Sequence, residues 1–203
     1  MAKIGLFFGT FNPIHHGHLM MANYLVNNTD IDKLFFVVSP NSPFKDTQRQ
    51  LVSFEQRCKM IDLSIVNNKK MMVSKIESEL DTPMTYTYNA LIALKEQYKN
   101  DEFVLIIGAD NLLTLHSWYR IADILQMVDI IVIPRNDIDF ISCTDEIYRE
   151  YPNVKNICIA GGCPYCSLSS TFVREQIKDN KDIGYYVTDA VQQYIVKHNL
   201  YAD

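Results

Sequence analysis

Three histidines fall within four positions near the start of the chain, at His15, His16 and His18, with Gly17 between the last two. An imidazole ring can bind a metal ion, donate a hydrogen bond to a phosphate, or take no part in chemistry at a protein surface. The cluster therefore allows three interpretations: a metal site, a phosphate site, or three unconnected surface residues.

Metal binding fits this spacing poorly. Structural zinc usually takes four Cys or His ligands from two separated pairs, and catalytic zinc takes three protein ligands. Three imidazoles crowded into one short loop converge on a single ion with difficulty, and no partner motif follows downstream. We therefore expect no metal ion held by protein side chains.

A phosphate site needs fewer assumptions. Gly9 permits a tight turn directly after an apolar run, and the helical pattern that follows offers backbone N–H groups at its start. His15 and His18 are three residues apart, so both rings can direct N–H donors at one phosphate chain. Unconnected surface histidines remain the alternative.

Strand-like and helical patterns alternate along the chain and indicate how this loop is held. Apolar runs predict strands over residues 3–8, 33–39, 71–76, 102–108, 129–134 and 156–161. Helical spacing predicts helices over residues 18–28, 53–66, 85–98 and 188–199, the second opened by a capping box of Ser53 and Gln56. This order predicts an α/β fold, a Rossmann-like, doubly wound, mainly parallel sheet with helices on both faces. Such sheets bind ligands beyond the carboxyl ends of their strands, where the histidine loop falls.

Size and composition limit the class of protein. A chain of 203 residues, 48% hydrophobic, is expected to form a single domain over 1–203, with a helical C-terminal part from about residue 167. A net charge of −5 argues against a nucleic-acid partner. We expect no membrane partner and a cytoplasmic location, because no apolar stretch is long enough to span a bilayer, no secretory signal is recognisable, and the five cysteines lack framework spacing. A homo-oligomer remains open.

The motifs then resemble a known family. "GTFNPIHHGH" resembles the H-x-G-H signature of the nucleotidylyltransferases, in the version of the bacterial nicotinate mononucleotide adenylyltransferases. Five further segments resemble motifs of that family in the same order: "SPNSPFK", "SFEQRCKM", "TYTYNAL", "IGADNLLTLHSW" and "SSTFVR". Together the six segments extend over nearly the whole chain.

The resemblance implies an enzyme of NAD biosynthesis. It would transfer the adenylyl group of ATP to nicotinate mononucleotide, giving nicotinate adenine dinucleotide and diphosphate, with Mg²⁺ bound to the ATP. A preference for nicotinamide mononucleotide, or dual specificity, is the alternative with the same chemistry.

The resemblance also assigns residues. Catalysis is expected from His15, His18, Lys45 and Arg174. The expected ATP site comprises Gly9, Thr10, Phe11, His15, His18, Gly108, Asp110, Ser169, Ser170, Thr171 and Arg174. Nicotinate mononucleotide is expected at Asn12, Lys45, Thr85, Tyr86 and Trp118, with the indole stacked on the pyridine ring. From the residues alone, Asp110 is also a candidate helix N-cap, and Trp118 could equally be a packing residue.

The sequence departs from the family at three places. Phe44 stands where the family usually has His, Ala90 where it has Thr, and residues 135–137 replace its R-P-G. Arg57 is expected to form an ion pair with a neighbouring carboxylate.

One motif points to a different class. "CPYC", Cys163 to Cys166, is the dithiol sequence of glutaredoxins, so a thiol-redox or metal-binding protein is the alternative. The motif falls late in the chain, and no cis-proline context of that kind accompanies it. We therefore interpret the pair as ordinary loop cysteines.

Overall fold

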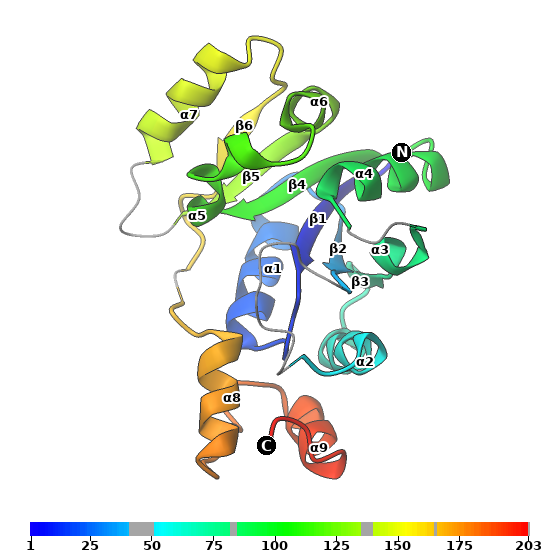
Figure 1. Ribbon diagram of the computed structural model, residues 1–203, viewed down its shortest axis with the longest axis vertical. Coiled ribbons are helices and arrows are strands. Elements are labelled where there is room, and N and C mark those ends of the chain that lie inside the picture. Colours follow the sequence, from blue (N-terminus) through cyan, green and yellow to red (C-terminus); the bar gives the residue numbers. More distant parts are fainter. Residues whose placement is uncertain (41–50, 82–84, 135–139, 165, 203) are drawn as a thin grey trace.

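A computed structural model describes residues 1–40, 51–81, 85–134, 140–164 and 166–202 (Figure 1). The strands are β1 Lys3–Gly9, β2 Lys33–Val38, β3 Met71–Ser74, β4 Glu102–Gly108, β5 Asp129–Ile133 and β6 Ile157–Ile159. The helices are α1 His16–Asn28, α2 Phe54–Ile65, α3 Ile76–Glu79, α4 Thr87–Gln97, α5 Ala109–Leu112, α6 Ile121–Met127, α7 Phe140–Glu150, α8 Ser170–Lys178 and α9 Asp189–Lys197. Each predicted strand is confirmed to within two residues at either end.

The strands form one parallel sheet in the order β3-β2-β1-β4-β5-β6. The predicted doubly wound fold is confirmed. β1 lies between β2 and β4, with Gly9 opposite Val38 and Phe7 opposite Ile106. Strand order therefore reverses at β1, and the loops that leave β1 and β4 diverge there. Open α/β sheets bind ligands in the crevice that this divergence creates.

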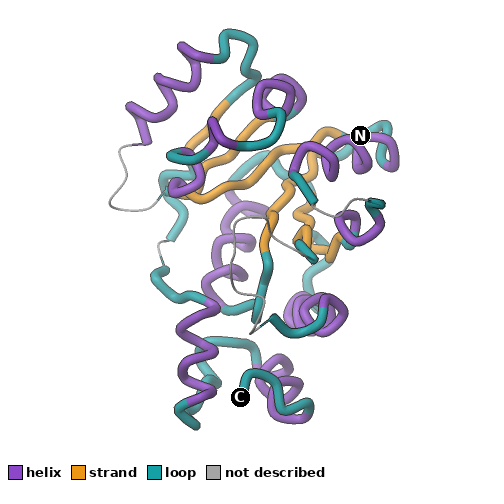
Figure 2. Tube along the Cα trace, viewed as in Figure 1, coloured by secondary structure: helices purple, strands orange, loops and turns teal. Residues whose placement is uncertain are grey.

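Helices cover both faces of the sheet, as the sequence predicted (Figures 1 and 2). Along β2, Phe36 and Val38 pack with α1, α2, α8 and α9, whereas Phe35 and Val37 pack with α4 and α6 on the other face. Successive side chains of a strand point to opposite faces, so a strand buried on both sides must be apolar throughout. This requirement explains the unbroken "LFFVV" of the sequence.

The start of α2 is fixed as predicted. Gln56 N donates to Ser53 Oγ at 3.2 Å, and Ser53 N donates to Gln56 Oε1 at 3.1 Å. The reciprocal pair satisfies two N–H groups that the first helical turn leaves without partners. It sets the position of the next side chain, Arg57, which reaches the loops after β1 and β2.

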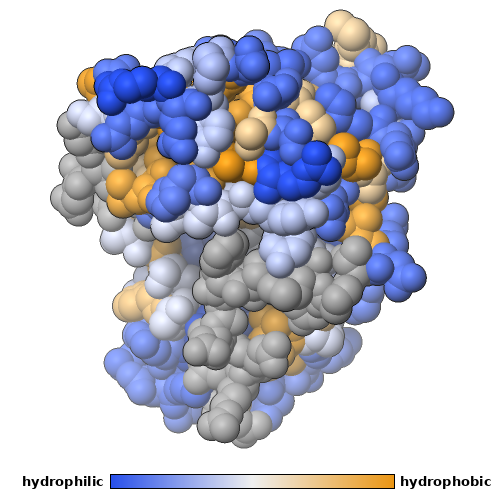
Figure 3. Space-filling view, turned by 45° about the horizontal axis from the view of Figure 1, so that its top comes forward, coloured by the Kyte–Doolittle hydropathy of each residue, from blue (hydrophilic) through white to orange (hydrophobic). Residues whose placement is uncertain are grey.

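The outer surface is mostly hydrophilic on the face shown in Figure 3, with smaller hydrophobic areas between the charged residues. Within the described ranges, none of the helices has the length and apolar character that spanning a bilayer requires.

Candidate active site

Two of the three histidines form the start of α1. His15 is the N-cap and His18 is the third helical residue. His18 N donates to His15 Nδ1, and His15 N donates to His18 Nδ1, both at 3.4 Å. The two rings stack with centroids 3.7 Å apart and planes 23° from parallel. Spacing of three residues thus produces a capping box made of imidazoles.

This arrangement decides which ring nitrogens carry protons. Because each Nδ1 accepts a backbone N–H, we assign the proton of each neutral ring to Nε2. Both residues line a cavity of about 490 Å³. Burial, with a smaller contribution from the charge of His16, lowers the pKa of His15 to about 4. At neutral pH His15 is therefore a neutral N–H donor.

The buried His15 should make stability depend on pH. Its pKa lies near 4 in the native protein, against about 6.5 in an unfolded chain, so the unfolded state binds more protons between these values. The free energy of unfolding should therefore decrease as pH falls through this window, by up to about 3 kcal/mol from this residue. Urea denaturation across the window checks this, with His15→Asn as the comparison because Asn also caps helices well. An equally steep loss of stability in the variant would contradict the assignment.

His16 has a different task. It is exposed, its Nδ1 lies 3.0 Å from the Tyr185 carbonyl oxygen, and its N–H donates to the Tyr186 carbonyl at 2.8 Å. His16 thus fastens α1 to the segment between α8 and α9. Of the three histidines, only His15 and His18 line the cavity.

The turn after β1 backs the histidine pair. Phe11 has φ of 49°, and its buried ring lies edge-on to the His18 ring at 5.1 Å between centroids. A Cβ atom at Gly9 would lie 2.7 Å from the Phe11 ring. Glycine is therefore required at position 9 for this ring to pack behind His18.

Asn12 is a structural centre of the same loop. Its side-chain oxygen accepts from the Tyr201 hydroxyl at 2.9 Å and from Val52 N at 3.3 Å, and its carbonyl accepts from Arg174 Nη1 at 2.8 Å. It lines the 490 Å³ cavity with the histidines, whereas Thr85 and Trp118 line a separate, smaller cavity that does not include Asn12. The sequence placed Asn12 with the acceptor nucleotide, and the structure does not bring it to Thr85 and Trp118.

The start of α8 completes the larger cavity. Ser169 is the N-cap and accepts from Phe172 N at 3.2 Å, and Ser170 Oγ donates to the Pro13 carbonyl at 2.8 Å. Arg174 is buried, and its Nη2 donates to Thr171 Oγ1 at 3.2 Å. The first turn of α8, with its N–H groups, hydroxyls and one cation, faces the histidine pair across the cavity.

Arg57 does not form the expected ion pair with a described carboxylate. Its guanidinium donates to carbonyl oxygens instead: Thr10 at 2.7 Å, Ser39 at 2.8 Å, Val52 at 3.2 Å and Pro40 at 3.4 Å. The expectation was wrong because the residue is 1% exposed and the turns after β1 and β2 direct carbonyls at it. Arg57 ties those two turns together.

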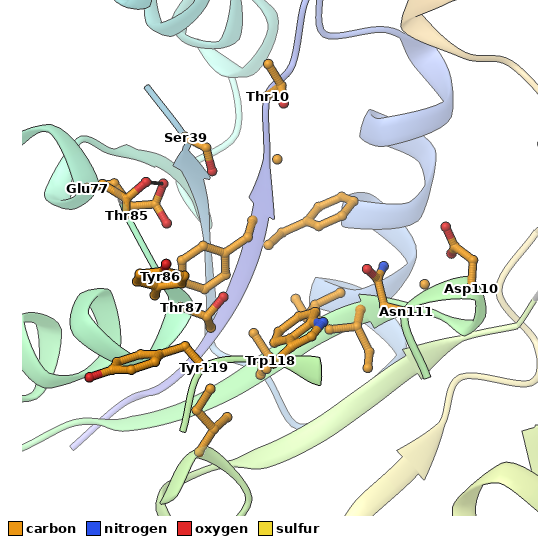
Figure 4. A pocket seen from close by; sticks show the side chains of 18 residues that line it. Thr10, Ser39, Glu77, Thr85, Tyr86, Thr87, Asp110, Asn111, Trp118 and Tyr119 are labelled. Carbon is orange, nitrogen blue, oxygen red and sulfur yellow. Dashed lines mark hydrogen bonds between the residues drawn. The ribbon is translucent and has the colours of Figure 1, made fainter. Parts of the chain in front are cut away.

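A second cavity, of about 300 Å³, adjoins the first (Figure 4). Its lining includes seven of the predicted site residues: Gly9 and Thr10, which also line the first cavity, and Thr85, Tyr86, Gly108, Asp110 and Trp118. The sequence had placed Gly108 and Asp110 with ATP, but the structure places them in this second group. Gly108, and not Asp110, is the N-cap of α5. Trp118 lies half-buried in the cavity wall and also packs against the hydrophobic core.

The two cavities share one wall, formed by residues 7–10 at the carboxyl end of β1. A ligand in the larger cavity therefore meets a ligand in the smaller one at Gly9 and Thr10. Ser39, Glu77 and Tyr119 also line the smaller cavity, and sequence reasoning did not identify them. Glu77 lies in the acidic segment "IESE", whose composition is typical of a solvent-exposed helix. Nothing in the local sequence therefore predicts that this side chain lines a cavity.

Some predicted residues lie outside the described ranges: Phe44, Lys45 and residues 135–137. Ala90 is described, and it is fully buried in α4.

The two cysteines of "CPYC" lie in the loop between β6 and α8 as free thiols. Burial raises the pKa of the Cys163 thiol, which reduces its thiolate form, whereas catalytic dithiols depend on a lowered pKa. Cys166 lines the larger cavity. Among the described residues, no three His, Cys, Asp or Glu side chains gather as a metal site would require.

The chain is similar to known proteins in both sequence and fold. The sequence profile of the cytidylyltransferase-like family matches residues 6–176. The chain is 38% identical to a probable nicotinate-nucleotide adenylyltransferase of Cytophaga hutchinsonii and 32% identical to the nicotinate-nucleotide adenylyltransferase of Bacillus subtilis, over 99% of both chains in each case. The fold resembles nicotinic acid mononucleotide adenylyltransferase of Plasmodium falciparum, solved in complex with NaAD. The TM-score is 0.77 at 25% identity, over 99% of this chain and 98% of that one.

Proposed function

The chain belongs to the nicotinate-nucleotide adenylyltransferases of the cytidylyltransferase-like family, and we propose that its two adjoining cavities hold the two substrates of that reaction. It transfers the adenylyl group of ATP to nicotinate mononucleotide, giving nicotinate adenine dinucleotide and diphosphate, a step of NAD biosynthesis. The observation that carries the assignment of substrates to cavities is their shared wall at residues 7–10. There an acceptor phosphate can approach the α-phosphorus of ATP.

The larger cavity takes ATP in this proposal. Adenylyl transfer is an in-line displacement at phosphorus, so the protein acts by positioning the reactants and stabilising charge. Nε2–H donors of His15 and His18 face the phosphates from one side, and the first turn of α8 with Arg174 faces them from the other. These donors stabilise the negative charge that collects on the departing diphosphate. Lys45 is assigned to the same phosphates by sequence alone.

The smaller cavity takes the acceptor. The Trp118 indole offers a flat apolar surface for the cationic pyridine ring. Thr85 and Tyr86 stand directly before α4, where the positive end of the helix dipole favours the ring's carboxylate. An amide at this position gains less from the dipole, so this arrangement supports the acid as acceptor.

Magnesium enters as part of the substrate. The described lining of the larger cavity consists of hydrogen-bond donors and apolar groups, and it contains no carboxylate. These residues fit a Mg²⁺ held by triphosphate oxygens and water, the usual state of this ion with nucleotides.

The five cysteines are free thiols, which fits a reducing compartment such as the cytoplasm.

Diphosphate release from Mg-ATP tests the proposal directly, with nicotinate mononucleotide and nicotinamide mononucleotide compared in parallel. We expect kcat/KM for the acid to exceed that for the amide by at least about tenfold, the factor that 1.4 kcal/mol of dipole interaction provides. Equal or reversed values would assign the enzyme dual or amide specificity. No release with either acceptor would overturn the adenylyl transfer itself.

A further inference from the structure

A buried carboxylate lies in the acceptor cavity. α3 is a single turn after β3, and it directs Glu77 inward while Ser78 and Glu79 remain exposed. Glu77 is 3% exposed and lines the cavity beside Thr85 (Figure 4). No Lys or Arg occurs in the described lining of this cavity. Burying a carboxylate where an anionic ligand must bind is costly, so we expect this carboxylate to make a compensating contribution to the site.

Two residues with hydroxyl groups lie beside this carboxylate (Figure 4). Thr85 Oγ1 donates to Glu77 Oε2 at 3.2 Å, and Ser39 lines the cavity next to the same side chain. Burial raises the pKa of Glu77, and the neighbouring Ser39 and Thr85 oppose that shift. Glu77 thus connects residues from two separate loops, the one after β2 and the one before α4.

Both loops line the acceptor cavity, and the one that carries Ser39 is also fixed to the turn after β1. Ser39 N donates to the Gly9 carbonyl at 3.0 Å, and Arg57 joins the Ser39 and Thr10 carbonyls through one Nη1. Ser39 is therefore fixed to the turn that both cavities share. Thr85 belongs to the start of α4, where no side chain of the N-cap residue holds the first turn. Glu77 lies between this start of α4 and Ser39 and is hydrogen-bonded to Thr85 (Figure 4).

We propose that Glu77 is a positioning residue for the acceptor, acting through Thr85 to fix the start of α4 relative to the Gly9–Thr10 turn. This inference rests on the proposed function. Its consequence is geometric: the acceptor ring is held by α4 while its phosphate reaches the shared turn. In-line transfer is sensitive to displacements of about 1 Å, so loosening this link affects the acceptor and leaves ATP binding intact.

Glu77→Gln tests the proposal with little change in volume, because the amide keeps one acceptor oxygen for one of the two hydroxyls. We expect KM for nicotinate mononucleotide to rise about tenfold and kcat to fall several-fold, with KM for ATP changed less than twofold. Glu77→Ala, which removes both acceptors, should have a larger effect of the same kind. Glu79→Gln is the matched control, since it makes the same substitution on the exposed side of the same turn.

A double-mutant cycle identifies the route. If Glu77 acts through the Thr85 hydroxyl, then Thr85→Val should add little to Glu77→Gln, whereas independent roles would give additive losses. Thermal unfolding of each variant gives a separate readout. Equal rises in KM for ATP and for the acceptor, accompanied by a lower Tm, would identify a merely structural residue and overturn the proposal.

The proposed function and this inference fail differently. A wild-type protein that releases no diphosphate with either mononucleotide overturns both. An active wild type whose Glu77→Gln and Glu77→Ala variants keep both KM values and kcat overturns the positioning role alone.

Discussion

Replacing His18 by Ala should lower kcat for adenylyl transfer by about 10³-fold, because the variant loses a fixed N–H donor aimed at the charge that develops on phosphate. The His15 ring also loses its stacking partner at 3.7 Å, so the remaining donor is held less firmly. KM for ATP should change much less than kcat, since a donor that acts mainly in the transition state contributes little to ground-state binding. Steady-state diphosphate release measures both constants.

Two variants distinguish the loss of the His18 N–H donor from a loss of stability in α1. Gln at the third helical position keeps the capping contact to His15 N while removing the imidazole, so His18→Gln should retain a Tm near wild type and still lose most of kcat. His116→Ala, at an exposed position, should leave both properties unchanged. A His18→Gln enzyme with nearly full kcat would show that capping, and not a phosphate contact, is what His18 supplies.

The fold could be predicted because its signals are local and repeated. Six apolar runs separated by helical patterns allow few arrangements other than a parallel sheet with helices on both faces. The structure adds α6 and α7, where the sequence analysis predicted no helix, and the one-turn helices α3 and α5, which are too short to show periodicity. These short turns matter for the site, because α3 carries Glu77 and α5 follows Gly108.

The part of the site that sequence could identify is the part that lies in contiguous motifs. His15 and His18 lie at the start of one helix, and Ser169 to Arg174 lie in the first two turns of another, so the spacing within each motif brings its donors together. Glu77 and Ser39 escaped notice because their meeting depends on three loops folding onto one another. No pattern within either segment records such a contact.

Arg57 and Asn12 also show that contacts between distant loops cannot be inferred from local sequence. Both were noticed in the sequence, but the sequence did not show which groups hydrogen-bond to them. A buried guanidinium usually suggests a carboxylate, yet here four carbonyl oxygens of irregular loops serve as acceptors. Asn12 is engaged by Tyr201, which is 189 residues away in sequence. Only the folded backbone shows that these two residues support the loop.

Arg174 is expected to give the second large effect. Its Nη1 donates to the Asn12 carbonyl and its Nη2 to Thr171 Oγ1, so the guanidinium is held at a fixed position in the wall of the larger cavity. Arg174→Gln should lower kcat/KM for ATP by about 10³-fold, the lower end of what a fixed arginine contributes to phosphoryl transfer. Arg174→Lys should recover part of this loss, because it keeps the charge but cannot make both contacts at once.

The part of the Arg174→Gln loss that comes from its hydrogen bond to Asn12, and not from its charge, can be measured separately. Tyr201→Phe removes a different hydrogen bond to Asn12 without changing any cation, and Lys178→Gln removes a positive charge from the exposed end of the same helix. We expect Tyr201→Phe to cost stability but less than about tenfold in kcat/KM, as is usual for one hydrogen bond worth about 1 kcal/mol. We expect Lys178→Gln to have no effect on either. A loss in Tyr201→Phe as large as that in Arg174→Gln would mean that Arg174 acts by holding Asn12, whereas a loss confined to Arg174 assigns its charge to the phosphates.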